Sequence, residues 1–395
     1  MVPLSRIVCL DLDTFFVSVE RLLDPTLVGK PVVVGGTGWR GVVTSASYEV
    51  RRFGVRSGMS SVEARRLAPN ATFVGSSHGV YGEYAAKVRG ILERWCPVVR
   101  TASIDEFFLD FHGCESLYRH PEDADGDATV ERVVWSLRGD IQRELGLPAS
   151  AGIATTRPLA KIASGLAKPA GVRMVRAGEE LAFVRDLPVR KFPGIGGVAE
   201  ARLKASGIHT LGDLLSRGGE SSDSLRRAVF PEELAALGDD RPAFQEYDQG
   251  GTHGSISNET TFHMDLGDRQ VLCDRLRALS ERVCWRLRRR GVKARTVGLK
   301  LRYSDFQTLD RSQTIPATDA EGVVLDTVCT LLDRARRRDL PVRLVGVRLS
   351  NFVGQPEQLA LPFEAPPPAS LAIDAVRARF GYEAIRLGAA RRSAR

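Results

Sequence analysis

Apolar, strand-like runs alternate with helical patterns over the first 165 residues, and this alternation restricts the fold more than any other feature. Between the runs lie segments such as SVEARRLA and YAAKVRGILERW, in which apolar residues recur every three or four positions. Strands separated by amphipathic helices build a sheet that the helices cover. We therefore predict an α+β domain with strands at residues 6–12, 31–35, 41–46, 104–111 and 149–154.

The chain continues beyond this domain, because 395 residues exceed what one core usually holds, roughly 250–300. From KPAG (168–171) onward the pattern predicts a small helical module, and residues 239–253 read as a linker without apolar periodicity. Beyond the linker we predict a basic helix and then a strand with one apolar and one basic face. The apolar face has Val297, Leu299 and Leu301, and the other has Gly298, Lys300 and Arg302. RHPEDADGDATVE (119–131) predicts a solvated loop.

Acidic residues stand at the ends of two predicted strands. An apolar run leads into Asp11 and Asp13, and Asp105 and Glu106 are neighbours in TASIDEFFLD, residues 101–110. Neighbours in a strand point to opposite faces, so a merely solvated strand would not place acid beside acid. Asp11, Asp105 and Glu106 would suit a hard divalent cation such as Mg²⁺. Two solvated acids at a strand end are the commoner alternative, and Asp13 also fits the N-cap of a helix.

Two basic segments are suited to bind phosphate. In GVVTSASYEVRRFGVRSGMS (41–60), Tyr48 and Arg51 are three positions apart and share a helical face, so that a hydroxyl and a guanidinium reach one phosphate. Lys161 and Lys168, seven positions apart, likewise share a helical face. A solvated basic helix and ordinary surface lysines are the commoner readings of these two patterns.

A glycine turn gives a more specific signal. In FPGIGGVAEARLKASGI (192–208), Gly194 and Gly196 open a turn between helices. Such a turn lets backbone N–H groups approach a phosphate oxygen at a helix N-terminus. The pattern has the form of a helix-hairpin-helix, which grips nucleic-acid backbone without reading sequence. A tight helix connection without a ligand is the alternative.

Composition supports a polyanionic partner and argues against export or membrane insertion. The formal net charge is +8, with charged residues of both signs making up 26% of the chain. The six cysteines form no CxxC pair, which is against a disulfide framework or a zinc site. No run approaches the roughly 20 apolar residues of a membrane span. We expect a monomeric, cytoplasmic protein with no membrane partner.

In combination these motifs resemble the Y family of translesion DNA polymerases, most closely the bacterial DNA polymerase IV type, from about residue 5 to residue 363. The motifs are DLDTFFVSVE, ASYEVRRFGVRSGM, SIDEFFLD, AGIATTRPLAKIASGLAKPAG, FPGIG and SISNETTF. The resemblance implies a right-hand polymerase with a ferredoxin-like palm, small fingers, a helical thumb with the helix-hairpin-helix and an α+β little finger. The implied boundaries are 1–18 and 77–165 for the palm, 19–76 for the fingers, 166–238 for the thumb, 239–253 for the linker, 254–350 for the little finger and 351–395 for the tail.

The resemblance also implies roles for residues near the acids. Asp105 and Glu106 would be catalytic, and two Mg²⁺ ions would be held by Asp11, Asp105, Glu106 and the main-chain carbonyl of Leu12, with Asp13 outside this set. Phe16 would be the steric gate that excludes the ribose 2′-hydroxyl. The implied triphosphate-binding residues are Phe15, Thr44, Tyr48, Arg51 and Lys161.

Further from the acids, the resemblance implies contacts to primer-template DNA and to a sliding clamp. We expect DNA affinity to fall steeply with salt. QLALPF (358–363) resembles the peptide by which bacterial polymerases dock on the clamp, a plain extended linker being the alternative. The implied DNA contacts are Gly194, Gly196, Arg289, Arg290, Lys300 and Arg302, and the clamp contacts are Gln358, Leu359, Leu361 and Phe363.

The implied function is template-directed DNA synthesis of low fidelity from deoxynucleoside triphosphates. A two-metal nuclease needs the same acids but has no use for Phe16 or for a triphosphate set. A catalytically inactive DNA-binding relative would be marked by loss of a metal ligand, and all three acids are present. Two departures from the family pattern, Phe107 and TTRP at 155–158, bear on packing under the acids and on the base-pair pocket, and hence on fidelity.

Overall fold

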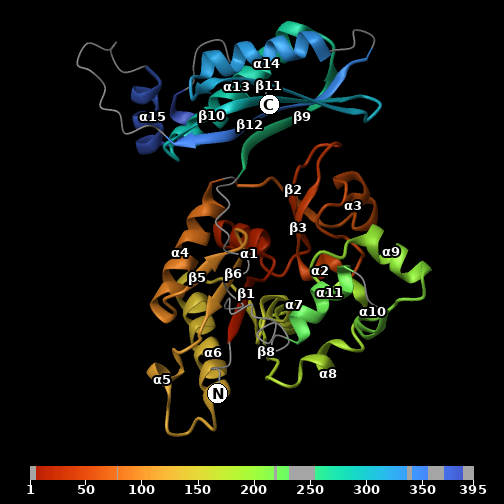
Figure 1. Ribbon diagram of the computed structural model, residues 1–395, viewed down its shortest axis with the longest axis vertical. Helices are drawn as coiled ribbons and strands as arrows, with labels where there is room; N and C mark the ends of the chain where they lie inside the picture. The colour runs from red at the N-terminus through yellow and green to blue at the C-terminus, as the bar shows by residue number, and fades with distance from the viewer. Residues whose placement is uncertain are drawn as a thin grey trace. The chain divides into compact units, whose positions relative to one another are not determined.

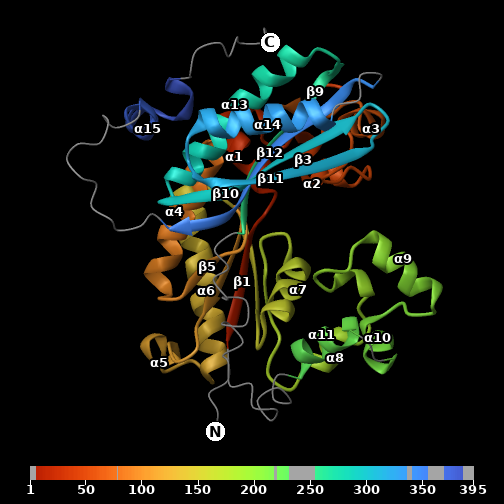
Figure 2. The ribbon, with the colours of Figure 1, turned by 45° about the horizontal axis from the view of Figure 1, so that its top comes forward.

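The structure is a computed structural model that describes residues 6–77, 79–217, 220–230, 254–335, 340–354 and 369–385. The chain divides into two compact units, Met1–Gln249 and Gly250–Arg395, called here the N-terminal and C-terminal units. Figures 1 and 2 show the elements of each. Among the described residues no helix has the length and apolar character needed to cross a membrane.

A five-stranded sheet forms the centre of the N-terminal unit, in the order β5-β6-β1-β7-β8. β1 pairs antiparallel with both β6 and β7, and β8 joins β7 in parallel. With α4 between β1 and β5 and α6 between β6 and β7, the order is that of a ferredoxin-like βαββαβ fold, as predicted. The bounds are β1 Ile7–Leu12, α4 Val80–Trp95, β5 Val99–Thr101, β6 Glu106–Asp110, α6 Gly126–Leu145, β7 Ala149–Ala154 and β8 Val172–Met174.

Alternation along β1 explains how the helices cover this sheet. Val8, Leu10 and Leu12 pack into one core with α4 and α6. Ile7 and Cys9 point the other way, into a core with α7 (Arg157–Ala167), and Figure 2 shows α7 on the side opposite α4 and α6. Asp11 continues the Ile7–Cys9 series and therefore points to the α7 face.

A small sheet and further helices make up the rest of the described part of the N-terminal unit. The sheet has the order β3-β2-β4 and its own small core. The helices that follow α7 share one core with it, and the Thr156 hydroxyl donates to the Ala228 carbonyl at 2.9 Å. The bounds are α1 Phe15–Leu23, η1 Pro25–Leu27, β2 Val32–Gly35, β3 Val43–Ala46, α2 Tyr48–Arg51, α3 Ser61–Leu67, β4 Thr72–Val74, α5 Glu115–Tyr118, α8 Glu180–Val184, η2 Val189–Lys191, α9 Gly197–Ala205, α10 Leu211–Arg217 and α11 Glu220–Val229.

The C-terminal unit is an antiparallel sheet in the order β11-β10-β12-β9, with α13 and α14 on one face (Figure 1). Val297, Leu299 and Leu301 of β10 are buried against these helices, whereas Lys300 and Arg302 are not, so the predicted two-faced strand is confirmed. The bounds are β9 Ser255–Leu266, α13 Arg269–Arg288, β10 Val292–Tyr303, β11 Thr308–Thr318, α14 Glu321–Ala335 and β12 Val342–Gly354.

The last described segment, α15 (Ala369–Phe380) with η3 (Tyr382–Ala384), docks on α13 of the C-terminal unit. Arg377 donates to Glu281 at 3.0 Å, and both side chains are almost fully buried. Arg288 joins Asp374 and Glu321, each at 2.6 Å. A buried charge that loses its partner is costly, so these pairs specify one docked position for α15.

The predicted solvated loop at 119–131 is wrong in its second half. α6 begins at Gly126, and the Asp125 side chain caps it by accepting from the Ala128 N–H at 2.8 Å. Asp123 and Asp125 of this segment are paired rather than simply solvated, since Arg132 contacts Asp123 and Arg176 contacts Asp125. The run of acids concealed a capped helix start.

Candidate active site

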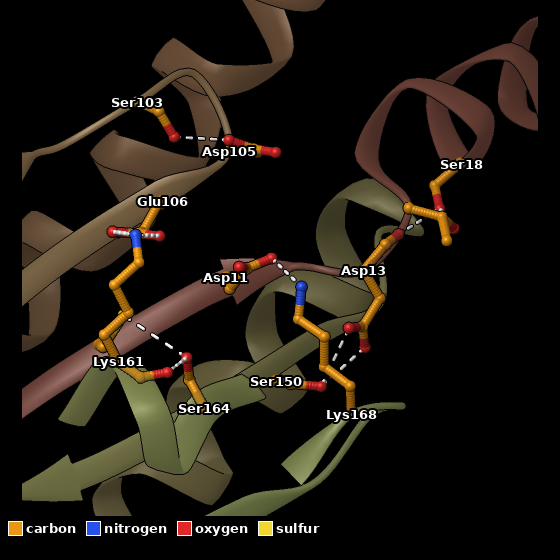
Figure 3. A network of polar contacts seen from close by, with 12 residues as sticks. Asp11, Asp13, Ser18, Ser103, Asp105, Glu106, Ser150, Lys161, Ser164 and Lys168 are labelled. Carbon is orange, nitrogen blue, oxygen red and sulfur yellow. Dashed lines mark hydrogen bonds and ion pairs between the residues drawn. The ribbon is translucent and has the colours of Figure 1, made fainter. Parts of the chain in front are cut away.

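Asp11 and Glu106 are directly opposite each other on neighbouring strands. They are register partners in the antiparallel pairing of β1 with β6, so both carboxylates leave the sheet on the α7 face. Asp105 lies just before β6, and its carbonyl accepts from the Leu12 N–H at 2.9 Å. Its carboxylate accepts from the Ser103 hydroxyl at 2.5 Å. The three acids therefore lie at one end of the sheet, where Figure 3 shows them.

Two lysines contact these acids. Lys161 of α7 places its Nζ 2.7 and 2.5 Å from the two Glu106 carboxylate oxygens. Lys168, which follows α7, places its Nζ 2.5 Å from Asp11 Oδ1 (Figure 3). Burial raises the pKa of Asp11 to about 6, against the opposing effect of the Lys168 ammonium. The ammonium groups thus balance the charges of Glu106 and Asp11.

The side chains fit a hard cation by chemistry but not in their present positions. Carboxylates and a main-chain carbonyl are the oxygen ligands that Mg²⁺ prefers. Within the described ranges, however, no group of three or more Asp, Glu, His or Cys side chains stands close enough to hold a metal ion. Lys161, Lys168 and Ser103 engage the acids instead.

Asp13 is not a helix cap. α1 begins at Phe15 after Thr14, which has φ 45° and makes no side-chain cap bond. The buried Asp13 carboxylate instead accepts from the Ser150 hydroxyl at 2.8 Å, the Ala170 N–H at 2.7 Å and the Tyr48 hydroxyl at 3.2 Å. The Asp13 carboxylate therefore links three segments: β7, α2 and the turn that follows α7. Sequence reasoning missed this role.

Tyr48, the first residue of α2 after strand β3 of the small sheet, lies close to the acids. Its hydroxyl donates to the carboxylate of Asp13, which follows Asp11 by two residues in the chain, so the phenol lies beside the strand end that carries Asp11. The Arg51 guanidinium carbon lies 5.0 Å from the Tyr48 ring centroid, so the predicted hydroxyl and guanidinium pair is adjacent in space. Burial and the neighbouring Asp13 raise the pKa of Tyr48, which keeps the phenol a neutral donor. Thr44 lies on β3, half-buried, and Phe15 is buried at the start of α1.

Phe16 is held by aromatic neighbours. Its ring contacts Tyr81 edge-on at a centroid distance of 4.7 Å and Phe15 at 5.5 Å. The Tyr81 hydroxyl donates to the buried Glu20 carboxylate and accepts from the Ser77 N–H at 2.8 Å. The position of Phe16 is therefore fixed by Tyr81, a residue that sequence reasoning did not single out.

The glycine turn has an open backbone. Gly194 has φ 94°, a conformation that favours glycine, and Gly196 is the N-cap of α9 without a side-chain cap bond. A Cβ atom added at either residue would meet nothing within 4 Å. A phosphate oxygen can therefore approach the backbone at the start of α9.

The predicted DNA contacts of the C-terminal unit fall into two groups. Lys300 and Arg302 project from the face of β10 opposite the helices, and Lys300 Nζ lies 2.7 Å from Glu259. Arg289 and Arg290 follow α13, which covers the other face, and the Arg289 guanidinium carbon lies 5.2 Å from the Trp285 ring centroid. The predicted clamp contacts Gln358, Leu359, Leu361 and Phe363 lie outside the described residues.

The chain matches three parts of one protein family. Residues 10–165 match the impB/mucB/samB family, 253–361 its C-terminal domain and 177–208 its HHH motif. A DNA polymerase IV of Dehalococcoides mccartyi is 37% identical over 398 residues, which cover 98% of this chain and 97% of that protein. A DNA polymerase IV of Streptomyces coelicolor is 38% identical over 87% of this chain and 70% of that protein.

Solved structures of polymerases share the fold. A Y-family DNA polymerase chimera of Dbh and Dpo4 is 25% identical, with a TM-score of 0.70 over 89% of this chain and all of that one. An insertion ternary complex of Dbh DNA polymerase superposes over the same shares, with a TM-score of 0.57 and 24% identity.

Proposed function

The chain belongs to the Y family of DNA polymerases, in the group of the bacterial DNA polymerase IV enzymes, and on this premise we propose that it copies DNA past damaged template bases by two-metal-ion nucleotidyl transfer. The observation that carries the proposal is the cross-strand pair Asp11 and Glu106, with Asp105 beside it, at one end of the sheet. The chain is a DNA-directed DNA polymerase, and we propose that two Mg²⁺ ions serve its reaction.

Asp11, Asp105, Glu106 and the Leu12 carbonyl would hold two Mg²⁺ ions. Bound there, the ions would lower the pKa of the primer 3′-hydroxyl and stabilise charge on the leaving pyrophosphate. The protein holds the carboxylates in place through the β1–β6 register and keeps Leu12 fixed by its bond to Asp105. Asp13 positions this end of β1 by accepting from Ser150 and Ala170.

The incoming triphosphate would be bound by side chains of α1, β3 and α2 and by lysines in and just after α7. Tyr48 and Arg51 offer a neutral hydroxyl and a guanidinium that would share one phosphate. Thr44 on β3, shortly before Tyr48, and Phe15 at the start of α1 belong to this set. Lys161 and Lys168 now neutralise Glu106 and Asp11. We propose that both ammonium groups move to the triphosphate when the carboxylates take up cations, so Lys168 joins the predicted set.

The remaining parts of the chain would hold the substrate nucleic acid. The five-stranded sheet is assigned to the palm, the small sheet to the fingers and the glycine turn to the thumb, with Gly194 and Gly196 toward the DNA backbone. Lys300 and Arg302, on the open face of the C-terminal sheet, are proposed phosphate contacts, with Arg289 and Arg290 beside that sheet. Phe16, braced by Tyr81, is the proposed steric gate. The protein is proposed to act as a cytoplasmic monomer.

Primer extension tests the proposed reaction. With an undamaged primer-template, Mg²⁺ and deoxynucleoside triphosphates, the wild-type chain is expected to add the templated nucleotides. Chelation with EDTA should stop extension completely, and excess Mg²⁺ should restore it, because the acids offer only oxygen ligands. Shortening of the primer would instead indicate a nuclease. Retained DNA binding without extension would indicate an inactive relative.

The segment QLALPF is proposed to dock on the sliding clamp. Substituting both Leu361→Ala and Phe363→Ala removes two apolar anchors, each worth about 2 kcal/mol at a hot spot. The ratio of extension with clamp to extension without it should then fall toward one. Glu357→Ala, just outside the peptide, is the matched control and should keep the ratio. An unchanged ratio in the double variant would assign this segment to a linker.

A further inference from the structure

Two cysteines of the C-terminal unit face each other across its helix pair. The thiols of Cys273 on α13 and Cys329 on α14 have their sulfurs 3.1 Å apart, although the residues are 56 positions apart in sequence. One helical turn away on each helix, Arg269 and Asp333 form a two-point ion pair at 2.5 and 2.7 Å. The two helices therefore run antiparallel here, and the ion pair fixes their register beside the sulfurs.

We propose that Cys273 and Cys329 form a reversible disulfide under oxidising conditions and so cross-link α13 to α14. The sulfurs need to come only about 1 Å closer to reach the roughly 2.05 Å of a bond. With hydrogen peroxide as oxidant, a thiolate first becomes a sulfenic acid and releases hydroxide, which takes up the proton lost by the thiol to give water. The second thiol then displaces a second water to close the bond. Two thiols are oxidised and one peroxide is reduced to two waters.

The surroundings of the pair predict slow closure that responds to pH. Cys329 is half-buried and Cys273 is 8% exposed, so Cys329 is the more exposed residue of the pair. Burial and the Cys273 neighbour raise the pKa of Cys329 to about 12, with Arg269 acting against them and Asp333 with them. The thiolate fraction of Cys329 is therefore small near neutral pH, and it rises about tenfold per pH unit as long as the pH is below that pKa. The closure rate should rise with pH accordingly.

The cross-link should also stabilise the unit. A bridge between residues so far apart in sequence removes much freedom from the unfolded chain. For a unit of this size we expect the unfolding temperature to rise by roughly 10 °C on oxidation and to return on reduction. α13 and α14 form the core with β10, so the bridge would strengthen the support of the sheet that carries Lys300.

The test uses the full chain, first reduced and then treated with hydrogen peroxide. Peptide mapping without reductant is expected to show one bridge that joins Cys273 to Cys329, with a mass loss of two hydrogens. Thermal unfolding is recorded before oxidation, after it and after re-reduction. Cys329→Ala should abolish both the bridge and the temperature shift. Cys284→Ala, on the same helix α13 and fully buried, is the matched control and should keep both.

Three outcomes would overturn the proposal. In the first, both thiols of the peroxide-treated protein still react fully with an alkylating agent after unfolding. In the second, the cysteines are oxidised to sulfinic or sulfonic acids without forming a bridge. In the third, the only bridge found joins Cys96 to Cys114. Since wild-type protein supplies all of these readouts, failure of a variant to fold would not affect the result. None of them depends on polymerase activity.

Discussion

Asp105→Ala is expected to lower the rate of template-directed primer extension by at least about a thousandfold. This corresponds to a loss of about 4 kcal/mol of transition-state stabilisation. The reason is that the carboxylate supplies oxygen ligands where charge develops in the proposed reaction. Asp105 is the cleanest of the three acids to remove. Asp11 and Glu106 each contact a lysine, which would lose its partner, whereas in the described part of the chain the Asp105 carboxylate pairs with no lysine or arginine and bonds to Ser103.

The measurement is single-turnover extension with saturating nucleotide, together with DNA affinity by fluorescence anisotropy. Asp110→Ala is the matched control, since Asp110 ends the same strand β6 and bonds locally to the His112 N–H at 2.9 Å. This control should extend primers normally. Near-normal extension by Asp105→Ala would remove this residue from the active site. Loss of DNA binding in the same variant would point to misfolding instead.

The palm could be predicted from sequence because its central strands have clear apolar patterns. β1, β6 and β7 are apolar runs of five or six residues, and the structure places them within two residues of the predicted bounds. The edge strands β5 and β8 escaped prediction because three residues are too few to show alternation. The same holds for β4 of the small sheet.

The surroundings of the acids could be predicted only in part. Asp13 fits a local capping pattern, but three donors from distant segments, Ser150, Ala170 and Tyr48, engage its carboxylate instead. Such tertiary bonds leave no periodic trace in the sequence. Lys168 had a signal, its spacing of seven from Lys161, yet that spacing alone could not separate a site residue from a surface lysine.

The structure also shows how the bulky side chain of Phe107 is accommodated. By alternation on β6 its side chain points away from Glu106, and it is buried in the core with α4 and α6. The bulky residue therefore fills space under the sheet rather than in front of the acids. Its effect on fidelity would have to act through the position of β6.

Phe16→Ala is expected to raise the ratio of ribonucleotide to deoxynucleotide incorporation by roughly 10- to 100-fold. A 2′-hydroxyl pressed against a packed wall costs about 1–3 kcal/mol, and removing the ring relieves that cost. The wall is rigid here because Tyr81 packs on Phe16 and is itself held by Glu20 and Ser77. The measurement is kcat/KM for each nucleotide type opposite the same template base.

Two comparisons separate a steric gate from a general loss of packing. Phe16→Tyr keeps the ring and should keep the discrimination, whereas loss of it there would show that packing rather than ring volume decides. Tyr81→Phe removes only the hydroxyl that bonds to Glu20, so the Phe16 ring is less firmly held and a smaller rise is expected. Because the gate acts on the sugar alone, chelation should stop extension in all three variants. Unchanged sugar selection in Phe16→Ala would place the discriminating contact on another residue of the nucleotide site.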